Sequence, residues 1–357
     1  MGRLRVAFIG GGRIADLHAL GYRDNPKAEL YAVCDAREEV ARQRAEEWGA
    51  PEHCTDYRDL LSDRAIEMVE VITPHHLHAE MTIASLEAGK HVSVQKPMAI
   101  NLTEADAMIA AATRSGRKMR VLENFRYYPP NVKAKELIDE GAIGEPLSIR
   151  LKVIGGSPEY GWAVPMEAWM WRVDDARCGG GPSIFDHGYH MFSMAMYFLG
   201  AVEKVFGWIE KTEVVPGMYW DAPAMLIWKY RDGAKFGCWE TVGHPRLVVR
   251  SDYYANDEWM EITGSEGLVW VNQCSGHMLK RPAVVLYRQG EVTEYHDLET
   301  DWASSFVRGV HDFIDAILEE RECPLTGAEA KEILRFSLAA HLSAREQREV
   351  YLDEVTG

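Results

Sequence analysis

Short apolar runs and longer amphipathic stretches alternate along the first 125 residues. Hydrophobic positions between the apolar runs recur with helical period, and two of these stretches end at Gly49 and Gly89, as helices commonly do. The predicted strands are 4–9, 30–34, 68–72, 91–94 and 119–122. The predicted helices are a run ending at Leu20, 38–48, 56–61, 78–88 and a stretch beginning at Thr103. Strands that alternate with helices predict an α/β domain with a doubly wound parallel sheet, the Rossmann arrangement.

The pattern changes at about residue 126. A helix at 131–140 precedes a strand at 147–154, in which Leu147, Ile149, Leu151 and Val153 form one face. Further predicted strands are 202–211, 224–230, 234–241, 259–263, 268–271 and 283–287. Asp232-Gly233 is a two-residue hairpin signal, and 302–320 and 328–349 are predicted helices. Many strands with few helices predict an α+β domain on a mostly antiparallel sheet.

Length, charge and cysteine usage restrict the class of protein. The 357 residues are enough for two domains, and the net charge of −16 argues against nucleic acids and anionic membranes as partners. No apolar run approaches the ~18 residues of a membrane span, and no export signal precedes the first strand. The six cysteines are scattered without a C-x-x-C pair, so we expect reduced thiols and a cytoplasmic protein.

The first strand runs into a glycine turn that opens a helix. Gly10-x-Gly12-x-x-Ala15 matches the dinucleotide fingerprint, in which Gly10 permits the turn and Gly12 lets backbone approach a pyrophosphate. The second strand ends at Asp35, at the interval expected for an acid that accepts hydrogen bonds from adenosine ribose. The carboxylate favours NAD over NADP, whose 2′-phosphate it would repel, although Arg37 softens that repulsion. We therefore predict NAD as the cofactor.

Polar residues follow two further strands at the sheet edge where ligands bind in such folds. His75, His76 and His78 follow Thr73-Pro74, but no acidic or cysteine ligand accompanies them, so we predict capping or cofactor contacts and no metal. Lys96 follows the strand at 91–94. A lysine there can stabilise negative charge that develops on a substrate oxygen, although its position alone also fits a solvated surface lysine.

A second group of candidate residues lies beyond residue 126, where the pattern changes. Pro182 is suited to a helix start, and Asp186 and His190 are four residues apart, so they share one face of the predicted helix. A carboxylate beside an imidazole raises its basicity and makes a general base for a hydroxyl proton. In isolation the same pair also fits a helix-start aspartate with a structural histidine. His187 points away from Asp186 and is either substrate-facing or structural.

Taken together, these residues resemble the Gfo/Idh/MocA oxidoreductases. The similar features are the glycine turn, Cys34-Asp35, Thr73-Pro74 with His78, residues 88–92, Lys96-Pro97, Asn124 with Arg126, Trp171-Arg172, residues 179–181, and Asp186 with His190. The resemblance implies a Rossmann domain at 1–125 and an α+β domain with a large open-faced sheet at 126–325. It also implies a C-terminal segment at 326–357 whose helix packs back on the first domain.

The resemblance also implies roles for individual residues. Lys96, Asp186 and His190 are the expected catalytic residues. The expected cofactor-binding residues are Gly10, Gly12, Arg13, Ile14, Asp35, Arg37, Thr73, Pro74, His78, Gln95, Lys96, Asn124, Trp171 and Arg172. The expected substrate-binding residues are Lys96, Arg126, Tyr127, Tyr160, Trp162, His187 and His190. The aromatic residues around 160–162 and 169–171 fit sugar stacking and core or subunit contacts equally well.

Two positions depart from the family pattern. Gln95 stands where the family usually has glutamate before Lys-Pro, which removes a charge beside Lys96. Ser193 stands where the family often has aspartate three residues after the catalytic histidine. Both proposed acid–base groups remain.

The expected function is hydride transfer from a secondary hydroxyl of a sugar, glycoside or cyclitol to NAD. His190 would act as base, Lys96 would stabilise the alkoxide, and Asp186 would orient His190. Two alternatives stay open: a redox-neutral NAD-dependent enzyme that cleaves glycosides or epimerises, and a non-catalytic NAD-binding regulator. Because an exposed sheet face is costly in a monomer, we expect a homodimer or homotetramer formed through the second-domain sheet.

Overall fold

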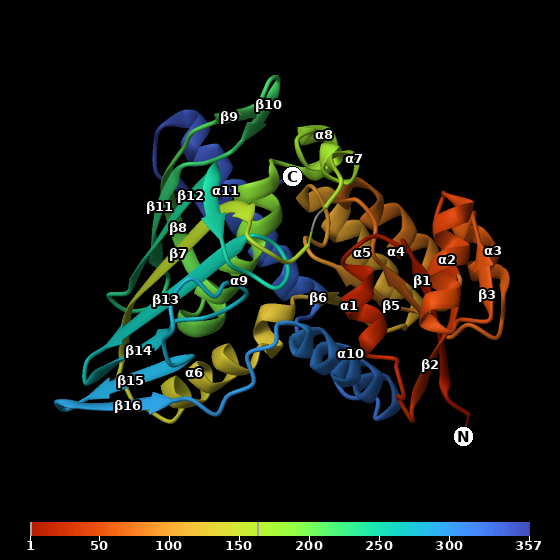
Figure 1. Cartoon of the computed structure of the whole chain (residues 1–357), viewed down its shortest axis with the longest axis horizontal. Helices are drawn as coiled ribbons and strands as arrows, with labels where there is room; N and C mark the ends of the chain where they lie inside the picture. Colours follow the sequence, from red (N-terminus) through yellow and green to blue (C-terminus); the bar gives the residue numbers. More distant parts are fainter. Residues whose placement is uncertain (1, 163) are drawn as a thin grey trace. The chain divides into compact units, whose positions relative to one another are not determined.

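The computed structural model describes residues 2–162 and 164–357 (Figure 1). Contacts divide the chain into two compact units, which are described separately. The first comprises the chain up to Asn124 with Phe306–Leu334 and Gly357, and the second comprises Phe125–Ser305 and Arg335–Thr356. Residues 306–325, which we expected in the second domain, therefore group with the first unit. Of the C-terminal segment, only the part up to Leu334 and Gly357 does so.

The first unit contains a six-stranded parallel sheet, as predicted. Its order is β3-β2-β1-β4-β5-β6, the doubly wound order in which the chain reverses direction between β1 and β4. The strands are β1 (Leu4–Ile9), β2 (Ala28–Cys34), β3 (Glu52–Cys54), β4 (Met68–Val71), β5 (His91–Gln95) and β6 (Met119–Leu122). The sequence analysis missed β3, a short edge strand without an apolar run.

Helices pack against the apolar side chains of this sheet. They are α1 (Ala15–Leu20), α2 (Glu38–Trp48), α3 (Tyr57–Ser62), α4 (His78–Glu87), α5 (Leu102–Ser115) and most of α10 (Ala303–Leu318), with the start of α11 (Gly327–Glu346). Helices α1 and α10 share one core with β1, in which Phe8, Tyr22 and Phe313 are buried. Helices α4 and α5 lie side by side (Figure 1). Strands β1 and β4 lie at the centre of this sheet, and they end just before the glycine turn and Thr73.

The second unit is built on a nine-stranded sheet of order β16-β15-β14-β13-β7-β12-β11-β8-β17. Among the described residues of this sheet, only β7 and β12 pair in parallel, so the predicted mostly antiparallel sheet is confirmed. Its strands are β7 (Pro146–Pro158), β8 (Val202–Ile209), β11 (Ala224–Tyr230), β12 (Phe236–Val249), β13 (Asn256–Gly264), β14 (Gly267–Val271), β15 (Val284–Arg288), β16 (Glu291–Tyr295) and β17 (Val350–Tyr351). A separate hairpin joins β9 (Thr212–Val215) to β10 (Met218–Trp220).

Helices cover one face of this sheet. The helices of the unit are α6 (Pro129–Asp139), α7 (Met166–Trp169), α8 (Asp175–Cys178), α9 (Gly188–Leu199) and the second part of α11. The Phe192 ring of α9 packs 5.5 Å from Trp239 on β12 and 4.6 Å from Phe336 on α11, measured between ring centroids. A side chain at Gly188 would lie 2.6 Å from Trp239, so glycine lets α9 approach the sheet.

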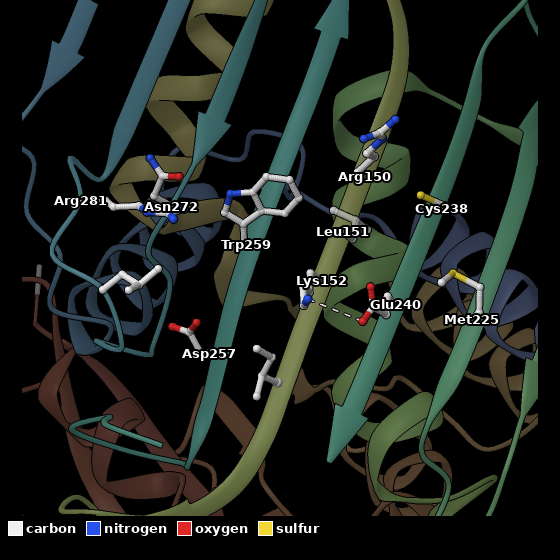
Figure 2. A pocket seen from close by; sticks show the side chains of 12 residues that line it. Arg150, Leu151, Lys152, Met225, Cys238, Glu240, Asp257, Trp259, Asn272 and Arg281 are labelled. Carbon is white, nitrogen blue, oxygen red and sulfur yellow. Dashed lines mark ion pairs between the residues drawn. The ribbon is translucent and has the colours of Figure 1, made fainter. Parts of the chain in front are cut away.

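The other face of the sheet carries exposed apolar side chains. Trp208, Ile227 and Phe236 are 48%, 47% and 56% exposed, and they alternate along their strands with buried residues. Figure 2 shows a pocket on this face, lined by Trp259, by Arg281 and by the Lys152–Glu240 ion pair of 3.6 Å. The open face implied by the resemblance is therefore present in this unit.

Two local predictions differ from the structure. Residues Pro182–His187 form a π-helical turn before α9 and not the first turn of a regular α-helix. The final predicted helix ends at Glu346, because the chain then turns to pair β17 with β8. Strands β9, β10, β16 and β17 were not predicted, since each is short or largely exposed.

Candidate active site

The glycine turn of the first unit is shaped for a phosphate. Gly10 has φ +108°, and a side chain there would come within 2.2 Å of the Ile72 carbonyl oxygen, so only glycine fits. A Cβ at Gly12, by contrast, would meet no protein atom within 4 Å. This open space before α1 fits the pyrophosphate that the fingerprint predicts.

Asp35 ties the second strand to that turn. Its Oδ2 accepts a hydrogen bond from the Gly11 N–H at 3.0 Å, and its Oδ1 accepts from the Arg37 N–H at 3.0 Å. The Arg37 guanidinium also reaches Oδ1 at 3.3 Å. Each carboxylate oxygen keeps acceptor capacity, which fits the hydroxyls of an adenosine ribose. Arg37 therefore partly neutralises Asp35, as we expected from sequence.

Thr73 and His78 follow β4 at the same edge. Thr73 Oγ1 is buried and has no hydrogen-bond partner among the described residues. An orphaned hydroxyl beside the Gly10 turn fits a polar group of a bound ligand. The nitrogens of buried His78 lie 2.7 Å from the Pro97 carbonyl oxygen and 2.8 Å from that of Thr73. Burial lowers the pKa of His78 to about 3, so the ring is neutral and its single N–H donates to one of these two carbonyl oxygens at a time.

Lys96 stands directly after β5 and is half-buried. Its backbone N–H donates to Gln95 Oε1 at 2.7 Å. The other end of the Gln95 amide, Nε2, lies 3.0 Å from His18 Nε2. Gln95, which we expected to bind cofactor, thus has both polar atoms engaged within the protein.

In the second unit, a buried carboxylate from a distant strand connection holds the π-helical turn. Asp221 accepts hydrogen bonds from the Ser183 N–H at 2.8 Å and the Ile184 N–H at 2.6 Å. Burial raises the pKa of Asp221, while these backbone bonds oppose that shift. Sequence analysis missed this residue, because nothing local marks an aspartate 38 positions away as a helix cap.

Asp186 and Arg172 form a largely buried ion pair. Arg172 Nε donates to Asp186 Oδ2 at 2.7 Å, and the guanidinium lies 4.3 Å from the Trp171 ring centroid. Burial opposes the charge on Arg172, but Asp186 raises the pKa of the guanidinium overall. The structure therefore brings two predicted site residues together in a charge-assisted hydrogen bond.

His190 lies in the first turn of α9, stacked on an aromatic ring. The Phe125 ring lies parallel to the imidazole, with centroids 4.1 Å apart and an interplanar angle of 9°. His187 meets His190 edge-on at 5.5 Å. His187, which we expected to be either substrate-facing or structural, thus lies beside the His190 ring. The sequence carried no signal for Phe125 as the stacking partner.

A second buried carboxyl, Glu258, stands beside His187. Glu258 Oε1 lies 3.4 Å from His187 Nε2, and the Ser275 hydroxyl donates to Glu258 Oε2 at 2.8 Å. Burial raises the pKa of Glu258 to about 7, although the Ser275 bonds oppose the shift. This group was also missed, because it lies in β13 one residue before the predicted strand 259–263, and no local motif marks it.

The remaining predicted substrate residues lie in two groups. Trp162 packs edge-on against Tyr253 at 5.2 Å and Tyr254 at 5.1 Å, while Tyr160 is exposed. Arg126 Nε donates to Ser193 Oγ at 3.1 Å. Tyr127, next to Arg126, is half-buried in the short 3₁₀ turn after β6.

The remaining predicted cofactor residues are spread over both units. Arg13 pairs with Asp16 at 3.2 Å, Ile14 precedes α1, and Pro74 precedes the turn that leads to α4. Asn124 is buried at the end of the first unit, and Trp171 stands in a 3₁₀ turn of the second.

The described residues also bear on metals and membranes. Among residues 2–162 and 164–357, no group of three or more histidine, cysteine or carboxylate residues could hold a metal ion. In the same part of the chain, no helix is both long and apolar enough to cross a bilayer.

Two family models match the chain. Residues 4–123 match the model described as an oxidoreductase family with an NAD-binding Rossmann fold. Residues 131–270 match the model of the GFO/IDH/MocA C-terminal domain. The two matches correspond to the parallel and the antiparallel sheet.

Individual relatives agree with both models. The chain is 28% identical to the myo-inositol 2-dehydrogenase of Thermotoga maritima, over 99% of this chain and 100% of that protein. It is 34% identical to the levoglucosan dehydrogenase of Pseudarthrobacter phenanthrenivorans, over 57% of this chain and 53% of the relative. A solved structure of levoglucosan dehydrogenase with NADH and levoglucosan superposes with a TM-score of 0.84. That comparison gives 25% identity and covers 98% of this chain and 100% of the other.

Proposed function

The chain belongs to the Gfo/Idh/MocA oxidoreductase family, and we propose that it oxidises a secondary hydroxyl of a sugar, glycoside or cyclitol in an NAD-dependent reaction. The observation that supports this most is the combination of an NAD-shaped glycine turn with a buried, ring-stacked His190. The relatives named as inositol and levoglucosan dehydrogenases support the substrate class.

The first unit would hold the cofactor. Gly10 and Gly12 leave room for the pyrophosphate, Asp35 accepts from the ribose, and Thr73 offers its orphaned hydroxyl. When bound there, NAD⁺ supplies the hydride acceptor for the reaction. Because Asp35 would repel a 2′-phosphate, NAD is preferred over NADP.

His190 takes the proton of the substrate hydroxyl in this proposal. Stacking on Phe125 holds the imidazole plane, so one ring nitrogen can remain aimed at the hydroxyl. Asp186, which pairs with Arg172, would support the imidazolium that forms. Lys96 stabilises the negative charge that develops on the same oxygen.

NADH formation measured by absorbance across a panel of inositols, sugars and glycosides tests this function. Reduction of NAD⁺ by at least one member of the panel, abolished in Lys96→Ala and His190→Ala, is the expected result. Tight NAD binding without net reduction on any member would contradict the proposal and favour redox-neutral or regulatory roles.

We also propose that the open sheet face binds a second copy of the chain. Ile227 is flanked by Phe206 on β8 and Cys238 on β12, and Trp208 and Phe236 are exposed on the same face. Covering so many apolar side chains favours self-association.

Sedimentation velocity at micromolar concentration tests the assembly. A dimer or tetramer is expected, with Ile227→Glu shifted toward monomer and Leu318→Glu, an exposed control on α10, unchanged. A monomeric wild-type protein would contradict this assembly.

A further inference from the structure

A row of buried polar groups leads from the Lys96 backbone into the first unit. Its members are Gln95 at the end of β5, His18 on α1, Glu70 on β4 and Tyr22 after α1. The Lys96 N–H bonds to Gln95 Oε1 at 2.7 Å, and Gln95 Nε2 lies 3.0 Å from His18 Nε2. His18 Nδ1 then contacts one oxygen of Glu70, and the Tyr22 hydroxyl donates to the other at 2.5 Å.

The chemistry of these groups fixes the direction of every bond. A backbone N–H can only donate, so the amide oxygen of Gln95 faces Lys96 and its NH₂ group faces His18. His18 Nε2 must therefore accept, which leaves the proton of a neutral ring on Nδ1, aimed at Glu70. All donors then point toward the Glu70 carboxylate.

Glu70 is a suitable final acceptor for this row of hydrogen bonds. Burial opposes its ionisation, but the hydrogen bonds from His18 and Tyr22 and the charge of Arg120 hold its pKa below the usual range. Buried Arg120 is itself held by the Ser93 hydroxyl at 3.1 Å and by the Gly309 carbonyl oxygen. Phe306 and Phe8 pack on the His18 ring at 5.3 and 6.4 Å. A buried network of this kind is rigid, because Gln95, His18 and Tyr22 each have one orientation that meets their partners.

We propose that Gln95 is a positioning residue for Lys96, locked by the His18–Glu70 pair in a single hydrogen-bond direction. An amide is the group required at position 95, because it accepts from Lys96 and donates to a neutral imidazole at once. A carboxylate there can bond His18 only if the ring carries a second proton. Gln95→Glu would thus place an imidazolium between two carboxylates and change the charge beside Lys96. The catalytic part of this inference rests on the proposed function.

Nitrogen NMR of the ¹⁵N-histidine-labelled full-length protein determines the direction of these hydrogen bonds without any substrate. At neutral pH we expect His18 to be neutral, with the proton on Nδ1, its signals assigned by their loss in His18→Gln. Gln95→Glu should give a doubly protonated ring at the same pH. Gln289→Glu, the same change at an exposed turn, should leave His18 as in wild type. A wild-type ring protonated on Nε2 would overturn the proposal.

A double variant separates positioning from simple damage to the fold. Glu70→Gln combined with Gln95→Glu exchanges the amide and the carboxylate, so every bond can form again with the His18 proton on Nε2. We expect this inverted tautomer in the double variant.

Turnover of the same variants tests the link to Lys96. We expect Gln95→Glu to lower kcat about tenfold at little change in KM for NAD, and the double variant to recover most of that loss. Unchanged kcat in Gln95→Glu would overturn the positioning role. Wild-type protein that turns over no substrate would overturn the proposed function instead, and the tautomer of His18 would still decide the hydrogen-bond chain.

Discussion

The two proposed catalytic groups, Lys96 and His190, are held by opposite kinds of surroundings. Lys96 is fixed through its backbone, by a chain of directional hydrogen bonds that ends on a buried carboxylate. His190 is fixed through its side chain, by a parallel aromatic ring and an apolar helix. Hydrogen bonds specify which atom carries a proton, whereas stacking restricts a ring without choosing its protonation state. Stacking therefore suits His190, a base that must gain and lose a proton.

Removing each group in turn gives the largest expected effect. His190→Ala should lower kcat/KM by about 10²–10⁴, because no base remains to take the hydroxyl proton. Lys96→Ala should lower it by about 10²–10³, because charge on the substrate oxygen loses its stabilisation. Steady-state kinetics measure both, with His53→Ala and Lys229→Ala as controls. Normal rates in either variant would remove that residue from the mechanism.

The carboxyl beside His187 predicts a pH-dependent stability. Because the pKa of Glu258 is raised to about 7 in the folded protein, the folded state holds this proton more tightly than the unfolded state. Its contribution is full below pH 4.5 and is lost as pH rises through about 7. This group should change the free energy of unfolding by about 3 kcal/mol across that pH range, and Glu258→Gln should remove the change. Urea titrations from pH 4.5 to 8 measure the free energy of unfolding at each pH. The same pH dependence in wild type and Glu258→Gln would contradict this assignment.

Loss of the stacked ring should affect rate more than folding. Phe125→Leu keeps an apolar side chain but frees the His190 ring, so we expect kcat to fall about tenfold and stability to fall by about 1 kcal/mol. Phe198→Leu, on the same helix as His190, should cost similar stability without the loss in kcat. Equal kcat values in the two variants would show that Phe125 only fills space.

The smallest expected effect concerns the choice of cofactor. Asp35→Ala removes the acceptor for ribose and leaves Arg37 without its partner, so the preference for NAD⁺ over NADP⁺ in kcat/KM should narrow about tenfold. Asp232→Ala, at a hairpin turn far along the sequence, should leave the preference unchanged. An unaltered preference in Asp35→Ala would place cofactor selection elsewhere.

The sequence predicted what depends on local pattern. Both sheets follow from periodicity, and the glycine turn with Asp35 follows from closely spaced motifs, whereas the family was inferred from a resemblance that extends along the chain. The contacts that Phe125, Asp221 and Glu258 make in the candidate site do not follow from local pattern, because each of these residues is far along the chain from its partner. The π-helical turn was missed for a related reason, since its cap comes from a distant residue. Gln95 was noted as a departure, but only the fold shows that both ends of its amide have partners.

Transfer of deuterium from the substrate carbon to the cofactor tests the central proposal most directly. A cyclitol or sugar labelled at its oxidised carbon would be incubated with the enzyme and NAD⁺, and the released cofactor would be analysed by mass spectrometry. We expect singly deuterated NADH in amounts equal to the oxidised product. Deuterium that never reaches released cofactor, or that returns wholly to a rearranged product, would contradict a net dehydrogenase.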